Sequence, residues 1–391
     1  MPLYEYRAYD AAGRLLKGLI DAPSERSAHD KVKERGLFPS AVTEDTGETG
    51  IRRGASGETL AFTMIQIATL LRAGMPLPAA LESVSSQVTV PALQRALVRS
   101  RVRLSEGKNL AEAMADETVF PPLLIRLVEA GNTVGELENI LERFAQFTER
   151  QDEMRRKLVG AITYPATVLV ASIALVIFML TYVAPTITGI YAGLGKDLPL
   201  PTMIMMGAGT FLETYAVWLV LAACLLVLAW WRLVPRRFKD TLALRTPFFG
   251  NLLTLSAAGR WCRTLAMLHA GGVPLQRALK GAREVLDNVV LMDDMGVVEQ
   301  QVETGSGLAA ALRKVWRMPP LVAQMAETGE RSGALEGLMN SAAEFYEKDL
   351  DRRIAQFFRL MEPAMIFGIG IIVGFVVVSI MLPIIQMNQL M

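Results

Sequence analysis

The stretch EAGNTVGEL, residues Glu129–Leu137, returns with small changes as ETGERSGAL at residues Glu327–Leu335. The two copies lie 198 residues apart. The same offset places GMPLPAAL, at Gly74–Leu81, on GVPLQRAL, at Gly272–Leu279. The repeated phrase is therefore one part of a longer internal similarity.

This similarity continues without a gap between Phe62–Pro185 and Arg260–Pro383. Along the way Pro165 falls on Pro363, so the alignment keeps its proline and glycine landmarks. Two unrelated amphipathic regions would not hold one register over such a length. The pattern predicts a tandem duplication in which each copy is one structural unit.

The composition indicates membrane segments. Hydrophobic residues make up 52% of the 391 residues, and the mean hydropathy is +0.32. Three long runs carry no charge: Leu158–Gly195, Thr214–Trp231 and Pro363–Met391. Each has the length of a membrane-spanning helix. Buried helices of a large soluble core are the alternative, which three such lengths disfavour. The net charge of only +1 gives no indication of nucleic-acid binding.

Basic residues flank these runs unevenly. They cluster before the first run, after the second and before the third, and only Lys196 lies between the first and second. The positive-inside rule then predicts a cytoplasmic N-terminus, three crossings and a periplasmic C-terminus. The predicted segments are spans at 164–185, 214–231 and 362–385, a periplasmic loop at 186–213 and a periplasmic tail at 386–391.

The polar remainder predicts two cytoplasmic helical bundles, at 58–163 and 232–361, each ending in a long helix that enters a span. Apolar residues recur there at spacings of three and four, prolines stand where helices begin and glycines where they end. Residues 1–45 have strand-like composition around a helix capped by Ser24, which predicts a small ββαβ module. The glycine-rich residues 46–57 are expected to form a flexible linker. The predicted fold class is a mainly α, polytopic membrane protein with an N-terminal α+β module.

The doubled phrase is expected to be a tight turn between two helices. An acid ends the first helix in each copy, one glycine supplies its left-handed cap, and a second glycine opens the next helix. In this interpretation the acids are Glu129 and Glu327, the capping glycines are Gly131 and Gly329, and the opening glycines are Gly135 and Gly333.

The two copies of the turn differ in charge. Glu330 and Arg331 stand in the second copy where the first has Asn132 and Thr133. One interpretation is a turn kept only for its shape. The other is that the second copy, with Glu327, Glu330 and Arg331, presents charge to a partner protein.

No motif for catalysis or for a cofactor is present in the sequence. The chain has no GxxxxGK[ST] phosphate loop, and its two histidines exclude an HExxH zinc site. Cys262 and His269 are seven residues apart on a predicted helix, where a core cysteine and an interface histidine are the simpler interpretation than a catalytic pair. We therefore expect no enzymatic activity, no metal and no cofactor.

Two other features have both a structural and a functional interpretation. Gly370 and Gly374 have the GxxxG spacing that lets membrane helices approach closely. They would pack against the first span or against a second protomer, although glycine is also simply common in membrane helices. The mixed charges of Glu149–Lys157 suit a solvated helix face, with a cation site or partner contact as the alternative.

The whole chain resembles general secretion pathway protein F and the platform proteins of type IV pili. The resemblance is carried by KLVGAITYP at Lys157–Pro165, by the AGMPL and GGVPL turns and by the doubled E-x-G-x-x-x-G-x-L phrase. The first copy departs from the family form at Asn132, where Glu is usual, and the second has Glu362 before Pro363 in place of Tyr.

The resemblance implies a platform in the bacterial inner membrane. Such a protein connects a cytoplasmic hexameric ATPase to pilin-like subunits and to other platform subunits, contacts membrane lipid, and forms homo-oligomers. Type II secretion is the favoured system, and type IV pilus biogenesis is the alternative. A transporter subunit is a weaker alternative, because the three charge-free runs contain no Asp, Glu, Lys or Arg side chain that could line an ion or substrate path. The other alternative is a soluble binding module that is attached to the membrane by anchors.

Overall fold

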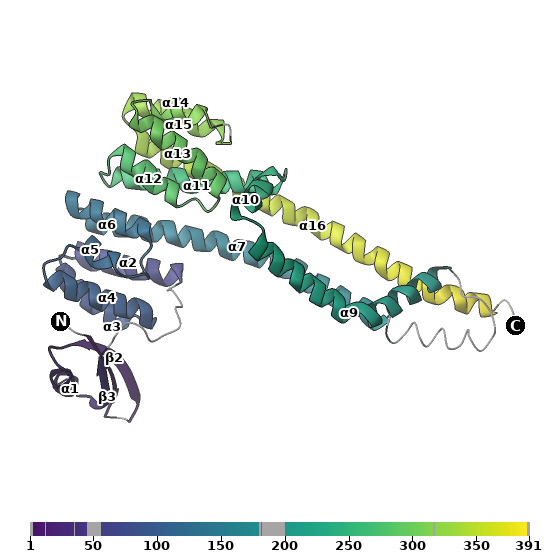
Figure 1. Ribbon diagram of the computed structural model, residues 1–391, viewed down its shortest axis with the longest axis horizontal. Helices are drawn as coiled ribbons and strands as arrows, with labels where there is room; N and C mark the ends of the chain where they lie inside the picture. Colours follow the sequence, from purple (N-terminus) through teal and green to yellow (C-terminus); the bar gives the residue numbers. More distant parts are fainter. Residues whose placement is uncertain are drawn as a thin grey trace. The chain divides into compact units, whose positions relative to one another are not determined.

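The computed structural model describes residues 3–388 except for 12, 35, 45–55, 180, 182–199 and 316. The described chain is mainly helical and divides into two compact units (Figure 1). We call them the bundle unit and the apolar unit. The bundle unit comprises Met1–Glu153, Ala257–Asp287 and Leu291–Glu344, and the apolar unit comprises Met154–Ser256, Asn288–Val290 and Phe345–Met391.

The bundle unit begins with the predicted ββαβ module. Its elements are β1 (Leu3–Tyr9), β2 (Leu15–Asp21), α1 (Glu25–Glu34) and β3 (Phe38–Glu44). The strands form an antiparallel sheet in the order β2-β1-β3.

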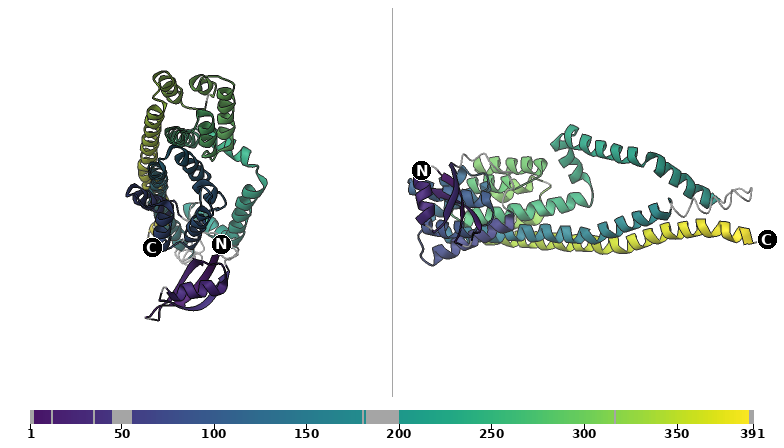
Figure 2. Two further views of the ribbon diagram at one scale, coloured as in Figure 1. Left: turned by 90° about the vertical axis from the view of Figure 1, so that its left-hand side faces the viewer. Right: turned by 90° about the horizontal axis from the view of Figure 1, so that it is seen from below.

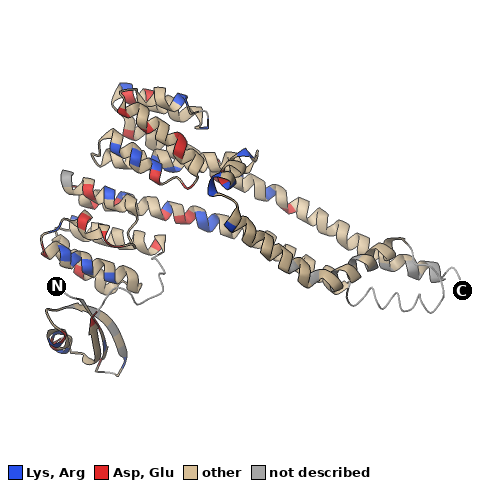
Figure 3. Cartoon of the chain, in the orientation of Figure 1, with Lys and Arg blue, Asp and Glu red and all other residues tan. Residues whose placement is uncertain are grey.

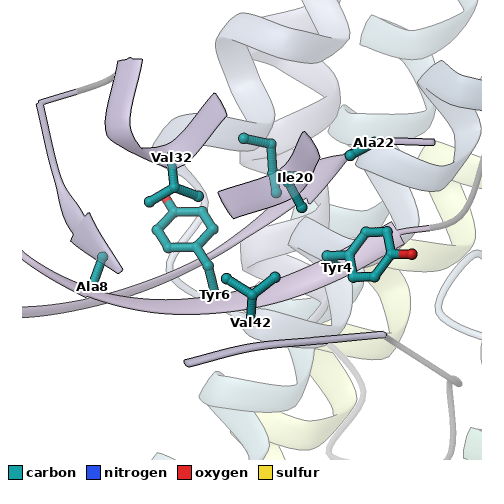
Figure 4. Close-up of a cluster of buried hydrophobic side chains, with 8 residues drawn as sticks. Tyr4, Tyr6, Ala8, Ile20, Ala22, Val32 and Val42 are labelled. Carbon is teal, nitrogen blue, oxygen red and sulfur yellow. The ribbon is translucent and has the colours of Figure 1, made fainter. Parts of the chain in front are cut away.

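Helix α1 starts as the sequence predicts, because the N–H of Ser27 donates a hydrogen bond to Ser24 Oγ at 3.3 Å. The helix covers one face of the sheet, and the side chains between them form a small core of their own (Figure 4). Alternate residues of β1 point into this core, as the two-residue period of a strand requires. The core consists of Tyr4, Tyr6, Ala8, Ile20, Ala22, Ala28, Val32 and Val42.

Two helical repeats follow. The first contains α2 (Gly57–Arg72), α3 (Leu77–Gln87), α4 (Pro91–Ser105), α5 (Leu110–Ala115), α6 (Pro122–Val134) and α7 (Leu137–Phe178). The second contains α11 (Phe249–Ala270), α12 (Leu275–Glu284), α13 (Val289–Glu303), α14 (Leu308–Arg313), α15 (Pro320–Ser332) and α16 (Leu335–Asn388). From α3 and α12 onward, each helix of the second repeat begins 198 residues after its counterpart.

The turns of the repeats agree in backbone conformation as well. Gly74 and Gly272 end the first helices with φ of 83° and 81°. Gly107 and Gly305 follow the third helices with φ of 91° and 93°. This left-handed region is open to glycine at little cost. The duplication predicted from the sequence therefore extends to individual turns.

The apolar unit holds the long charge-free segments. Helices α7 and α16 both continue from the bundle unit into it, and α9 (Leu200–Leu233) and α10 (Arg236–Arg245) join the two repeats. Helix α9 begins before the predicted span, so the prediction of a loop was wrong for residues 200–213. Pro201 in the first turn suits a helix start, and Glu213 does not interrupt the helix. Residues 186–199 of that loop and 389–391 of the predicted tail lie outside the described residues.

Two described helices are long and apolar enough to cross a membrane, within Leu137–Phe178 and Leu335–Ser379. A third span arises only if the bent pair Val217–Leu233 and Arg236–Arg245 is counted as one. The structure thus supports two of the three predicted spans by length and composition, and the third remains a prediction.

Within the apolar unit α7 and α16 run in roughly the same direction (Figure 2). At one end Lys157 Nζ and Asp351 Oδ2 form an ion pair at 3.5 Å. At the other end Met205 of α9 and Val376 of α16 are buried against each other, with Met179 packed beside them. Thr202 Oγ1 donates a hydrogen bond of 2.6 Å to the carbonyl of Ser379, and both residues are fully buried.

Candidate functional site

The doubled phrase forms a turn between two helices in both repeats, but its cap is not where the sequence places it. The left-handed residues are Gly135, with φ of 81°, and Gly333, with φ of 69°. Gly131 and Gly329 lie inside α6 and α15. The prediction that Gly131 and Gly329 cap the helix was therefore wrong, and each helix runs one further turn before it ends.

Gly131 and Gly329 instead allow the next helix to pack closely. A Cβ on Gly329 would lie 2.8 Å from the Cα of Leu335, which is closer than real Cβ atoms approach a backbone. On Gly131 a Cβ would meet Leu137 Cα at 3.3 Å and Ile140 Cδ1 at 3.0 Å. The absent side chain is what brings the two helices together at the turn.

The acid that precedes each of these glycines faces outward. Glu129 is exposed on α6. Its counterpart Glu327 pairs with Arg313 of α14 and with Arg331 one turn along α15, the latter at 2.9 Å. Glu327 therefore ties α15 to α14 on the surface of the second repeat.

Glu330 has a structural task that the sequence did not suggest. Its carboxylate accepts hydrogen bonds from the backbone N–H groups of Leu308 at 2.5 Å and Ala309 at 3.1 Å. These are the first residues of α14, whose N-terminal N–H groups have no partner within the helix. A carboxylate there also interacts favourably with the helix dipole.

In the first repeat the N-terminus of α5, the counterpart of α14, is capped by side chains of its own first turn. Asn109 Oδ1 accepts from the N–H of Glu112 at 2.9 Å, and Glu112 returns a bond to the N–H of Asn109 at 3.2 Å, which is a capping box. In the second repeat Gly307 takes the place of Asn109 and has no side chain to cap with. Glu330 replaces Asn132 and supplies the missing acceptor from another helix. Reading the two substitutions together in the register of the repeat would have revealed this pairing from sequence.

A polar cavity of about 320 Å³ lies between the two repeats inside the bundle unit. Helix α7 contributes Arg143 and Arg150, and the second repeat contributes Arg263 from α11 with Asn340 and Glu344 from α16. Arg143 Nη1 and Glu336 Oε1 form an ion pair between the repeats at 2.8 Å. No sequence pattern indicates this cavity, because its lining comes from segments more than a hundred residues apart.

Arg263 is the least expected residue of this cavity. It is only 8% exposed, it stands where the first repeat has Ile65, and its guanidinium donates to Asn340 Oδ1. Glu344 Oε1 lies 3.9 Å away. A buried guanidinium requires such partners. Polar contacts between the residues that line this cavity therefore connect the two repeats. Its described lining residues include no nucleophile and no set of metal ligands.

The first repeat buries a different ionic cluster. Glu117, between α5 and α6, is 8% exposed and faces Arg99 and Arg103 of α4, with its nearest pair at 3.2 Å to Arg103. Burial raises the pKa of Glu117, and the two arginines act in the opposite direction. The second repeat has Val297, Gln301 and Val315 at the corresponding positions, so the cluster is a feature of one repeat.

The remaining candidate residues, which belong to the apolar unit, take no part in the contacts described above. Pro165 and Pro363 fall inside α7 and α16. Around Gly370 and Gly374 a Cβ would meet nothing within 4 Å, so the glycines pack against no other part of the described chain. The packing of this GxxxG pair against the first span is not seen, and its contact with a second protomer remains a prediction.

Charged residues lie on the bundle helices, while the long stretches of α9 and α16 carry almost none (Figure 3). Among the described residues no group of three or more His, Cys, Asp or Glu side chains is placed to hold a metal ion. Cys262 and His269 both lie on α11, and Cys262 is completely buried. The site that the structure offers is a set of surfaces and interhelical contacts.

Fold and contacts define a duplicated helical protein, in which a small bundle leads twice into an apolar helix of membrane-spanning length. The chain belongs to the type II secretion system protein F family, whose model matches residues 63–185 and again residues 261–383. The model of the family's N-terminal domain matches residues 1–43. This is a family of structural components and not a known family of enzymes.

Several relatives resemble the chain over their full length. It is 34% identical over 403 residues to the type II secretion system protein F of Pseudomonas aeruginosa, covering 100% of both chains. It is 34% identical over 395 residues to the type IV pilus assembly protein PilC of Thermus thermophilus, covering 98% of this chain and 97% of the relative. A type II secretion system protein F of Vibrio cholerae is 30% identical over 404 residues, again covering 100% of both.

Proposed function

We propose that this protein is the inner-membrane platform of a type II secretion system. In this role it couples a cytoplasmic ATPase to the assembly of a pilin-like filament for protein export. The observation that carries the proposal is the duplicated unit of bundle and long apolar helix, in a chain matched twice by the family model. A platform of this kind works through surfaces and movements and needs no chemistry of its own.

The proposed topology has the N-terminal module and both bundles in the cytoplasm and the C-terminus in the periplasm. It takes the spans at 164–185, 214–231 and 362–385, with α9 returning the chain to the cytoplasm between the repeats. Basic residues on the cytoplasmic flanks support this direction. Both repeats then enter the membrane in the same sense, with their bundles on the same side.

The proposed partners are a cytoplasmic hexameric ATPase, other inner-membrane platform subunits, pilin-like subunits and a second copy of this chain. The bundle unit offers the ATPase charged surfaces on the exposed faces of its helices. The apolar unit offers the pilin-like subunits lipid-exposed helices. No nucleic acid is among the partners, since the net charge is near zero.

Type IV pilus assembly is the alternative system, and one observation favours it. The pilus assembly protein of Thermus thermophilus matches at the same 34% identity as the secretion protein of Pseudomonas aeruginosa. Deleting the gene separates the two systems: loss of protein export without loss of surface pili supports secretion, and the reverse supports the pilus. A transporter subunit is disfavoured because the apolar segments lack an ionisable pair of the kind that marks an ion or substrate path.

The proposal is tested with the full-length chain in lipid nanodiscs and its cognate ATPase. The chain alone should hydrolyse no ATP above background. Added to the ATPase it should co-purify with it and raise its turnover. Turnover by the chain alone that survives removal of contaminating ATPases would contradict the platform role, and so would a failure to bind the ATPase.

A further inference from the structure

Helix α10 leaves the end of α9 at a steep angle. The axes of Val217–Leu233 and Arg236–Arg245 differ by 107°. Ten residues are too few to span a bilayer. If α9 crosses the membrane, α10 therefore runs roughly parallel to the membrane surface, directly after the last apolar turn of the span.

One side of α10 exposes large apolar side chains. Phe238 is 58% exposed and Leu242 is 43% exposed, and their spacing of four residues puts them on the same face. Just before the bend, Trp231 and Leu233 are 76% and 77% exposed. A tryptophan beside a basic flank is typical of the membrane–water interface.

The other side of α10 is fixed to the protein. Asp240 Oδ2 accepts a hydrogen bond from the N–H of Val289 at 2.8 Å, and the Asp240 carbonyl accepts one from Asn288 Nδ2 at 3.2 Å. After the helix, Phe248 stacks on Phe357 of α16 with ring centroids 4.6 Å apart. These contacts prevent α10 from turning Phe238 and Leu242 inward.

The charge on α10 is almost wholly positive. Its sequence RRFKDTLALR contains four basic residues and one acid, and that acid is the anchoring Asp240. Arg236, Arg237 and Arg245 are exposed. An amphipathic helix with apolar residues on one face and basic residues beside them suits a surface of anionic lipid.

We propose that α10 is an interfacial helix that inserts Phe238 and Leu242 among acyl chains and binds the phosphates of anionic phospholipids through its arginines. This inference rests on the membrane placement proposed above. It assigns α10 the task of holding the start of α13 near the bilayer surface, since the same helix is bonded to Val289.

The test uses the full chain in phosphatidylcholine nanodiscs that contain a small fraction of spin-labelled phosphatidylglycerol or spin-labelled phosphatidylcholine. A fluorophore is attached through Leu242→Cys in a Cys224→Ser background, and quenching by each lipid is measured. Cys262 is fully buried and stays unlabelled. Native Cys224 of α9, which is exposed, serves as the label inside the proposed span. Val297→Cys on α13 is the matched control, with 48% exposure at the native valine.

Both lipids should quench the labels at 242 and 224 and leave the label at 297 unaffected. At 242 the phosphatidylglycerol should quench more strongly. The combined substitution Arg237→Gln and Arg245→Gln should reduce this preference by roughly fivefold for each arginine removed. Replacing chloride by inorganic phosphate at constant ionic strength should leave the preference unchanged.

Three results would overturn the inference while the platform role stands. A label at 242 that neither lipid reaches, with Cys224 quenched, would mean that protein covers α10. Equal quenching by the two lipids would exclude headgroup recognition. Loss of the preference in phosphate buffer would assign the arginines to a soluble phosphate. An unquenched Cys224 would instead remove the second span, and with it both the proposed topology and this inference.

Discussion

At the scale of single residues, the two repeats reach the same backbone with different side chains. Asn109 caps α5 from within its own turn, whereas α14 begins at Gly307 and receives its acceptor from Glu330. The acid that sequence comparison alone marks as a partner contact thus already has two N–H donors. Whether it also contacts a partner remains a prediction, and a charge reversal there would disturb α14 in either case.

The capping exchange predicts a rescue. Glu330→Ala should destabilise the start of α14 by about 1 kcal/mol, because two backbone N–H groups lose their acceptor. Adding Gly307→Asn should restore most of this loss, since Gly307 has the extended backbone, with φ of −64° and ψ of 147°, that an Asn cap adopts. Hydrogen exchange of the Leu308 and Ala309 amides measures both effects in the full-length chain. Unchanged exchange after Glu330→Ala would show that the carboxylate does not cap the helix.

The packing glycines predict an order of stabilities. Gly329→Ala should be the more harmful change, because its Cβ meets the backbone of Leu335 at 2.8 Å, and Gly131→Ala the milder one. Gly337→Ala, where a Cβ would meet nothing within 4 Å, is the matched control and should be neutral or stabilising by up to about 1 kcal/mol. Thermal unfolding in detergent checks the order. Equal loss at 329 and 337 would contradict the close-packing role.

At the scale of helices and turns, much of the architecture follows from the sequence. Proline and glycine landmarks predict where α4, α6 and α15 begin and where α2 and α11 end, because these residues restrict or relax the backbone locally. The choice between Gly131 and Gly135 as cap cannot be made locally. It depends on where Leu137 packs, and a contact between two helices leaves no periodic signal in either.

The contacts between the repeats could not be predicted from the sequence either, because contacts between distant helices leave no local pattern. Arg143 and Glu336 have no local pattern that pairs them, and Arg263 in place of Ile65 resembles an ordinary surface change. Likewise the start of α9 at Leu200 could not be read from charge, because residues 197–212 carry only the single acid Asp197. Hydropathy there predicts the apolar core of a helix better than its ends.

The ion pair between repeats predicts a small coupling. Arg143 and Glu336 have side chains 46% and 48% exposed, so a double-mutant cycle with Arg143→Gln and Glu336→Gln should give a coupling of about 0.2–1 kcal/mol. Thermal stability of the four proteins in the same detergent supplies the measurement. A coupling of zero would mean that the pair does not hold the repeats together, and raising the salt concentration should reduce any coupling that is found.

At the scale of the whole molecule, the proposed parallel insertion of the two repeats determines how many times the chain crosses the membrane. For two copies of one unit to enter the membrane in the same sense, the chain must cross back between the end of the first copy and the start of the second, which makes three crossings in all. Helices α7 and α16 contain the two equivalent segments that are long and apolar enough to span a membrane, and the proposed topology requires α9 to be the third span. The proposed interfacial position of α10 follows from this arrangement and places the return of the chain to the bundle side at the end of α9.

The most direct test of this account is the side of the membrane on which each segment lies. Paired reporters, one active only in the cytoplasm and one only in the periplasm, are fused after Gly57, Gly195, Gly250 and Met391 of the chain. We expect cytoplasmic activity at 57 and 250 and periplasmic activity at 195 and 391. A cytoplasmic signal after Met391 would contradict the three-span topology and, with it, the parallel insertion of the two repeats.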